Sequence, residues 1–444
     1  MSSDVDGMSA VERLSETEER LLQMAGGVSA AAEVVGTAVD EKSAEILYGG
    51  EIAPHRSLSS FLSLRIIRGG RLGGVGGTAS SPGKLLDMAI STARVGPEAC
   101  FEFPGSAHVE KVRLVDPATE ALGCVELARS LSELRARTTE LYPYSTLEGN
   151  LAVRRLTVSV RNSRGLQLTY HKALLEWDLQ LLVPTADGLV AFTSSAATGR
   201  CPDLPGSPLL DSLPRPDSLN EVEAPEDSPA RVIFSPEALS ILLQPVRVGV
   251  SGRSMLAGSS PLRNMEGGQV FSSVVTLVDR PLMDLGASSA PFDAEGVPTR
   301  DKALFERGVF DGFVFDLATA AQAGRESTGN AGRDYDTPPS PVVTNLEMAS
   351  GEGGLASLLE RLEDGYFVCD FQGGNSDAVT GDLTLDAGAA FRVRGGELEG
   401  RLRRLTISGN AYRLLSRVIA LSGERRLSGT DLLPYALVEG VELG

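Results

Sequence analysis

The sequence is poor in the residues that bind zinc through nitrogen and sulfur. Its 444 residues include three histidines, His55, His108 and His171, which are more than four positions apart, and four cysteines that form no CxxC pair. Zinc sites built from one short motif need such residues at close spacing. A His-based metal cluster cannot be built locally and would need distant residues to converge, the cysteine spacing argues against a zinc ribbon or a disulfide framework, and the cysteines are expected to be reduced.

Long apolar runs and an excess of positive charge are also missing. No window approaches the roughly 18 uninterrupted apolar residues of a membrane-spanning helix, and the first 20 residues are too acidic for a signal peptide. The formal net charge is −18, and the Lys and Arg residues are scattered. Such a chain repels phosphate backbones. We expect a cytoplasmic protein without nucleic-acid or membrane partners.

The chain is rich in turn-forming residues. Gly (49) and Pro (24) are abundant, whereas aromatic residues make up only 5%. This composition favours many short strands separated by turns.

Apolar spacing predicts helices in six places. The first follows a capping-box pattern at Ser9 and Glu12, and another opens with Ser235 and Pro236 as N-cap and first helical residue and is expected to stop at Pro245. The six ranges are 9–25, 84–95, 125–138, 235–243, 302–306 and 355–362.

The predicted fold is α+β, with N-terminal helices on an antiparallel sheet and a mostly β, barrel-like C-terminal domain. Strands are expected at 44–48 and 61–68, and a period of two from Leu151 to Tyr170 around an Asn-Ser-Arg-Gly turn predicts a hairpin. Residues 201–229 contain seven prolines and are expected to form a linker without a helix. The domain division is 1–105 and 106–200, both of mixed α and β structure, then the linker, then 230–444.

Common catalytic motifs are absent or incomplete. Gly74 to Ala79 matches a dinucleotide-binding pattern, but the breakers Pro82 and Gly83 follow it, which favours a flexible hairpin. Ser81 and Lys84 fit an SxxK pattern without its partner motifs, and no GxSxG nucleophile elbow occurs. A self-contained serine or cysteine hydrolase is unsupported.

A set of glycine- and proline-rich segments carries a more specific signal. They are Asp279-Arg280-Pro281, residues 291–300 (PFDAEGVPTR), 308–316 and 327–333 (STGNAGR), with further likenesses at 162–165 (NSRG), 379–382 (VTGD) and 407–410 (ISGN). In identity and order these segments resemble the TldD/PmbA family, and within it the PmbA or TldE branch. The resemblance extends from about residue 44 to the end of the chain.

The resemblance also shows which residues differ from the catalytic branch. In TldD subunits, a His-Glu-x-x-x-His helix and a cysteine near the C-terminus hold zinc. Here Gln244 and Gly249 stand at the histidine positions, Pro245 stands at the glutamate position, and Ser428 lies where the cysteine is expected. The resemblance therefore implies no metal and no catalytic residue in this chain, with zinc held by a TldD-like partner.

The implied function is that of a non-catalytic, TldE-like subunit of a heteromeric zinc metallopeptidase. Such a complex trims or degrades unfolded peptides or peptide precursors, and this chain is expected to be inactive alone. Ser327, Thr328, Asn330 and Arg333 are candidates for the substrate groove or the interface, since a glycine-flanked polar loop approaches a peptide backbone closely. A structural role for these four residues is an equal alternative.

Two other functions remain open from the sequence. One is a self-standing homodimer that acts as a binding or scaffold protein. The other is altered chemistry in a specialised biosynthetic pathway, using Gln244, Arg247 and Ser428 at the lost metal site.

Overall fold

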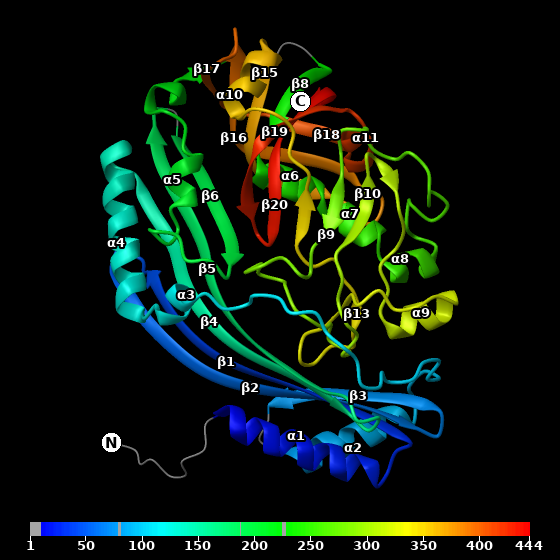
Figure 1. Ribbon diagram of the computed structural model, residues 1–444. Coiled ribbons are helices and arrows are strands. Elements are labelled where there is room, and N and C mark those ends of the chain that lie inside the picture. The colour runs from blue at the N-terminus through cyan, green and yellow to red at the C-terminus, as the bar shows by residue number, and fades with distance from the viewer. Residues whose placement is uncertain (1–9, 79–80, 187, 224–227) are drawn as a thin grey trace.

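The structure is a computed structural model that describes residues 10–78, 81–186, 188–223 and 228–444. It divides into a curved N-terminal sheet with helices on its outer face and a C-terminal domain packed against its inner face (Figure 1). The predicted α+β class, with a barrel-like C-terminal domain, is confirmed.

The N-terminal sheet has six antiparallel strands in the order β3-β2-β1-β4-β5-β6. Its strands are β1 (Ala31–Ile46), β2 (Ile52–Arg68), β3 (Arg71–Thr78), β4 (Thr146–Asn162), β5 (Gln167–Thr185) and β6 (Gly188–Thr198). The strand expected at 44–48 overlaps β1 only at residues 44–46, the strand expected at 61–68 is the second half of β2, and the predicted hairpin is β4–β5. One sheet thus takes strands from both 1–105 and 106–200, and the division at that point remains a proposal.

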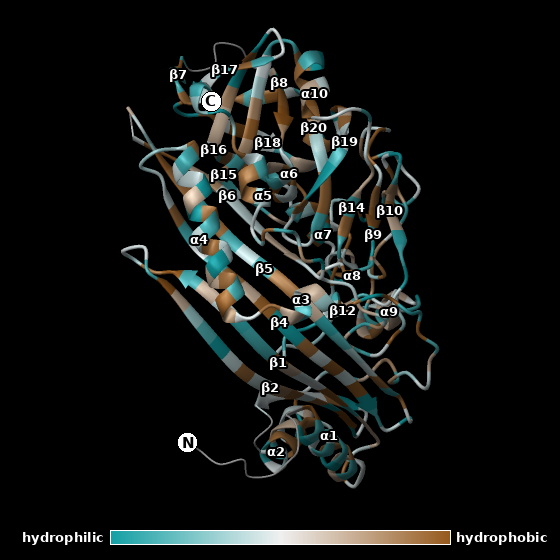
Figure 2. Cartoon of the chain, turned by 60° about the vertical axis from the view of Figure 1, so that its left-hand side comes forward, coloured by the Kyte–Doolittle hydropathy of each residue, from teal (hydrophilic) through white to brown (hydrophobic). Residues whose placement is uncertain are grey.

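Four helices accompany this sheet, namely α1 (Ala10–Gly26), α2 (Pro82–Ala93), α3 (Pro117–Ala121) and α4 (Cys124–Leu141). Figure 2 shows α4 lying across one part of the outer face and α1 and α2 at the other end. The α4 helix buries Leu127, Leu131 and Leu134, which share one face because they recur every three to four residues. Its predicted position is confirmed, as is that of α1, although Ser9 lies outside the described residues.

The C-terminal domain is organised around a closed five-stranded barrel. It comprises β8 (Ala230–Phe234), β15 (Gly365–Ser376), β16 (Asp382–Arg394), β18 (Thr406–Asn410) and β20 (Asp431–Leu443). Each strand pairs with the next in this order and β20 pairs with β8, so the ring has no open edge.

Short strands and helices surround the barrel. The strands are β7 (Glu221–Val222), β9 (Leu277–Asp279), β10 (Lys302–Glu306), β11 (Val309–Phe310), β12 (Ala331–Gly332), β13 (Ser340–Pro341), β14 (Leu346–Met348), β17 (Glu397–Leu402) and β19 (Val418–Ser428). The helices are α5 (Pro208–Ser212), the 3-10 turn η1 (Pro216–Leu219), α6 (Pro236–Leu242), α7 (Gln244–Gly249), α8 (Gly252–Ala257), α9 (Leu317–Ala323), α10 (Leu355–Leu362) and α11 (Ala411–Ser416).

Two secondary-structure predictions are wrong. Residues 302–306 form strand β10 and not a helix, because pairing with β9 and β11 outweighs the weak helical preference of five residues. The 201–229 segment does contain helical turns, since Pro208 and Pro216 occupy first-turn positions where the missing N–H is not needed.

The two halves share a hydrophobic core. Leu151, Trp177 and Phe192 of the N-terminal sheet belong to the same buried cluster as Phe391 and Leu437 of the barrel. This shared core joins the sheet to the barrel.

Candidate functional site

A cavity of about 470 Å³ lies between the inner face of the N-terminal sheet and the loops of the C-terminal domain. One row of its floor crosses four strands, because Phe61 and Val158 both pair with Thr37, and Val158 also pairs with Tyr170. The opposite wall comes from residues 288–299, 329–335 and 342–344. The volume falls within the roughly 300–1,000 Å³ of ligand pockets.

Two of the four groove candidates from the sequence line this cavity. Asn330 and Arg333 border it, whereas Ser327 and Thr328 do not. The Ser327 hydroxyl donates to the carbonyl of Phe315 (3.2 Å), and the Thr328 hydroxyl accepts from the Phe315 amide (2.8 Å). These two side chains hold the loop onto the segment between β11 and α9.

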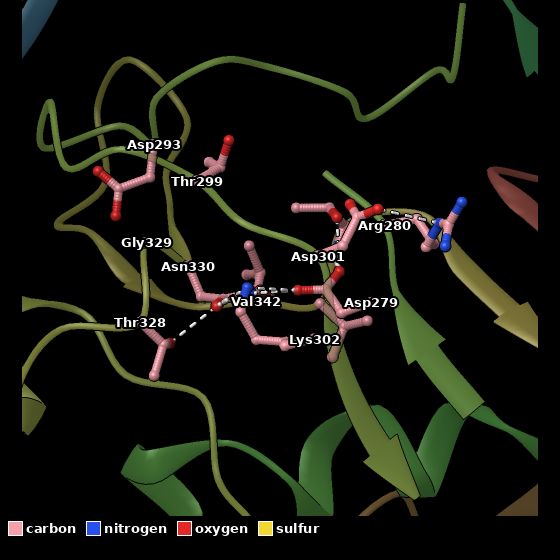
Figure 3. Close-up of polar contacts among 12 residues, drawn as sticks. Asp279, Arg280, Asp293, Thr299, Asp301, Lys302, Thr328, Gly329, Asn330 and Val342 are labelled. Carbon is pink, nitrogen blue, oxygen red and sulfur yellow. Dashed lines mark hydrogen bonds and ion pairs between the residues drawn. The ribbon is translucent and has the colours of Figure 1, made fainter. Parts of the chain in front are cut away.

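Asn330 is the centre of a buried polar network (Figure 3). Its amide nitrogen donates to Asp279 Oδ2 (2.7 Å) and to the carbonyl of Val342 (2.8 Å). Its amide oxygen accepts from Lys302 Nζ (2.9 Å) and from the Thr328 hydroxyl (2.8 Å). With four polar contacts satisfied within the fold, Asn330 mainly fixes the loop's position.

Asp279 is fully buried at the end of β9. It accepts hydrogen bonds from the amide (2.8 Å) and hydroxyl (2.5 Å) of Thr344 and forms an ion pair with Lys302 (3.2 Å). Burial lowers the pKa of Lys302, although the charge of Asp279 opposes that effect. The sequence alone predicts no role for Asp279 or Lys302, because the pairing of β9 with β10 is what brings them to Asn330.

A second buried cluster joins the sheet to the same loop. Arg65 on β2 pairs with Glu33 (2.8 Å) and Glu295 (2.7 Å), and Arg333 also pairs with Glu33 (2.9 Å). Burial disfavours the charged form of Glu33, but the positive charges of Arg65 and Arg333 outweigh this effect and lower the pKa of Glu33. Sequence analysis missed Glu33 and Arg65, whose only signal was charge inside apolar strand segments.

Asp293 lies against this cluster on the cavity wall. Its carboxylate accepts three backbone N–H groups, from Glu295 (2.9 Å), Val297 (3.0 Å) and Ala331 (2.9 Å). Burial and the charge of Glu295 raise the pKa of Asp293, against the opposing effect of these donors. Because its oxygens are engaged with the backbone, Asp293 shapes the loop and offers no free base.

The positions that correspond to a zinc site in the resembled catalytic subunits lie elsewhere. Pro245 ends α6 as predicted, but it also occupies the first turn of the short α7. Gln244 is exposed, and its Nε2 donates to the Ser240 carbonyl (3.5 Å). Gly249 lies against Tyr412, whose hydroxyl would be 2.1 Å from an added Cβ and donates to the Pro245 carbonyl (2.9 Å).

The fourth position, Ser428, is buried at the end of β19 and pairs with Asp431 across the β19–β20 hairpin. Asp431 forms an ion pair with Arg247 of α7 and accepts from the Leu346 amide (3.2 Å). Arg247, on α7 between Gln244 and Gly249, thus contacts the hairpin that carries Ser428. A guanidinium paired with the nearby carboxylate, an amide and a hydroxyl do not fit zinc, which takes thiolate, imidazole or carboxylate ligands.

Among the described residues, no three His, Cys, Asp or Glu side chains are grouped so that they could hold a metal ion. The part of the chain in view also contains no helix long and apolar enough to cross a membrane.

This barrel and its loops define the class of protein. Residues 227–444 match the PmbA/TldA metallopeptidase C-terminal domain. The chain is 29% identical over 209 residues to a metalloprotease PmbA homolog of Haemophilus influenzae (47% of this chain, 43% of the relative), and 30% identical over 173 residues to a metalloprotease of Methanothermobacter thermautotrophicus (39% and 38%). The C-terminal half of the chain is therefore a domain of the PmbA/TldA metallopeptidase type.

Solved structures extend the likeness in fold to nearly the whole chain. TldE from Thermococcus kodakarensis superimposes with a TM-score of 0.87, covering 96% of this chain and 100% of that chain at 22% identity. A putative modulator of a DNA gyrase from Thermotoga maritima gives 0.83, covering 97% and 100% at 20% identity. The alignments with the curated relatives, in contrast, span less than half of the relatives' own length.

Proposed function

We propose that this chain is the non-catalytic, TldE-like subunit of a heteromeric zinc metallopeptidase that trims or degrades unfolded peptides or peptide precursors. Its partner is a TldD-like chain that holds the zinc, and the complex works in the cytoplasm.

One observation carries the proposal, namely the set of side chains at the four positions that correspond to a metal site. Gly249 is closed by Tyr412, Pro245 begins a new helix, and Arg247 is paired with Asp431 beside Ser428. A positive guanidinium next to the site opposes a divalent cation. The family is that of metallopeptidases, so hydrolysis requires a second chain that supplies the metal.

The barrel is closed and the polar networks around Asn330 and Arg65 are intact, which favours a structural role for this chain in the complex. Asp279, Asn330 and Lys302 are buried and mutually satisfied, and the Arg65 cluster ties the loop to the sheet. The chain therefore offers a rigid wall for a peptide bound beside the partner's zinc.

The test is co-expression with a TldD-like chain encoded in the same genome. The account predicts a stable complex that cleaves unfolded peptide, whereas this chain purified alone is a poor peptidase. A homodimer that ignores the partner would overturn the proposal in favour of a scaffold protein. Turnover by this chain alone that is lost in Arg247→Met would instead indicate altered chemistry in a specialised pathway.

A further inference from the structure

The cavity between the sheet and the 329–335 loop has a floor of defined length, with an aromatic pair at each end. Phe61 on β2 stacks on Tyr335 with ring centroids 4.3 Å apart, and Tyr170 on β5 meets Phe292 edge to face at 5.2 Å. Three strand spacings separate β2 from β5, which is roughly 14 Å. An extended chain advances roughly 3.3 Å per residue, so about four residues span the floor.

The floor is apolar with a few unused hydroxyl groups. Val35, Val39, Leu156 and Val158 are among the apolar residues that line it. Within the described residues, the side-chain hydroxyls of Thr37, Ser63 and Tyr170 make no hydrogen bond to the protein. Burial raises the pKa of Tyr170 to about 12, which keeps its hydroxyl protonated as a donor at neutral pH.

The charged side chains around the cavity either have partners within the protein, are shielded from solvent, or lie at the rim of the cavity. Glu33 and Arg65 compensate one another, and the Asp293 carboxylate faces three backbone donors. Arg333 keeps Nε and Nη1 without a hydrogen bond, but both atoms are closed off from solvent. Asp334 is exposed on the loop beside the mouth. A charged ligand would lose its hydration without gaining an oppositely charged partner inside, and an acidic ligand would also be repelled at the rim.

The 329–335 loop on the opposite wall packs against β3 through a backbone contact that requires glycine. An added Cβ at Gly76 of β3 would lie 1.6 Å from the Tyr335 carbonyl oxygen, so only glycine lets the loop rest there. Arg333 anchors the same loop to Glu33. Tyr335 is therefore positioned over Phe61 from two sides.

From this geometry we infer that the cavity binds an uncharged, mostly apolar segment of about four residues of an extended peptide. The apolar floor takes the side chains, and the hydroxyls of Thr37, Ser63 and Tyr170 take peptide N–H or C=O groups. That the segment belongs to the substrate rests on the proposed function, whereas the binding itself is a property of this chain alone.

The test uses the full chain alone and two capped tetrapeptides, acetyl-Ala-Phe-Leu-Ala-amide and acetyl-Ala-Asp-Glu-Ala-amide, titrated by calorimetry. We expect saturable binding of the apolar peptide and at least about tenfold weaker binding of the acidic one. Val158→Trp fills the cavity and should weaken binding at least about tenfold. Thr157→Trp is the matched control, because Thr157 is the adjacent half-buried residue on the opposite face of β4, and it should change affinity less than about twofold.

Thr37→Val serves if Val158→Trp does not fold, as judged by circular dichroism. It removes one hydroxyl at nearly constant volume and should weaken the apolar peptide by about two- to tenfold. Unchanged affinity in a folded Val158→Trp or Thr37→Val protein, or no saturable binding by the wild type, would overturn the inference.

Failure of this inference and failure of the proposed function are separable. A chain that pairs with the TldD-like partner but binds no apolar tetrapeptide refutes only the cavity's role. A chain that binds the tetrapeptide and ignores the partner refutes the subunit proposal and leaves the binding site in place.

Discussion

At the residue scale, the contact between sheet and loop depends on a few buried charges. The side chain of Arg65 is 5% exposed and directs three charge-assisted hydrogen bonds at Glu33 and Glu295, which are fully buried. Burial opposes a charged guanidinium, but the two carboxylates outweigh it and raise the pKa of Arg65. Removing one member of such a cluster leaves the others uncompensated.

Arg65→Met should therefore lower the free energy of unfolding by about 3–5 kcal/mol. Arg56→Met is the control, since Arg56 pairs with Asp40 on the same strand pair but is 55% exposed, and its loss should leave the urea midpoint nearly unchanged. Equal midpoints for the two variants would show that the buried cluster contributes no more than a surface pair.

Lys172 is a second buried charge at this contact, and within the described ranges no carboxylate forms an ion pair with it. It is 7% exposed and donates to the Ala287 carbonyl (2.6 Å), and burial lowers its pKa to about 7. The unfolded chain, with an ordinary lysine pKa near 10.4, binds more protons between these two values. The contribution of Lys172 to stability is therefore present above about pH 10 and is lost as pH falls toward 7.

Lys172→Met should remove this pH dependence. Between pH 7 and 9 the wild type should gain unfolding free energy relative to the variant, by the order of 1 kcal/mol per pH unit. Urea titrations of both proteins at three pH values measure the difference. A difference that is constant with pH would mean that Lys172 keeps its ordinary pKa in the fold.

At the element scale, α6 and α7 decide what occupies the position of a metal site. Pro245 separates the two helices, and Gly249 gives room for the Tyr412 hydroxyl to reach the Pro245 carbonyl. A side chain at Gly249 and this hydroxyl exclude each other.

Gly249→Ala should destabilise the protein by about 1–3 kcal/mol, because its Cβ overlaps Tyr412. In a Tyr412→Phe background the same substitution should cost much less, since the overlapping oxygen is gone and alanine favours the helix. Thermal melts of the four proteins of this double-mutant cycle provide the measurement. Additive effects would contradict the proposed exclusion.

The sequence predicts elements well where the periodicity is long. Leu127, Leu131 and Leu134 identify α4, and the alternation around residues 151–170 identifies the β4–β5 hairpin. It fails at β10, where five residues carry too little periodicity and pairing with β9 and β11 decides the outcome.

The site was predictable only in part, because its partners are distant in sequence. Asn330 and Arg333 were chosen from a polar glycine-rich stretch, and both line the cavity. Their partners Glu33 and Asp279 lie 300 and 51 residues away, so only the folded topology brings them together. The floor residues Thr37 and Tyr170 had no signal beyond ordinary strand alternation.

At the scale of the whole molecule, one buried cluster joins a curved sheet to a closed barrel, and a cavity lies between the sheet and the C-terminal loops. The barrel belongs to a metallopeptidase family, yet the residues at its α6–α7 helices and β19–β20 hairpin are unsuited to zinc. A metallopeptidase-type barrel without zinc ligands is expected if the complex of two subunits is catalytic and this chain alone is not.

Native mass spectrometry of the complex co-purified with a TldD-like chain tests this account most directly. It measures the ratio of the two chains and, after gas-phase dissociation, which chain carries the metal. The account predicts one copy of each chain, with zinc retained only on the partner. Zinc on this chain, or a homodimer that leaves the partner free, would contradict it.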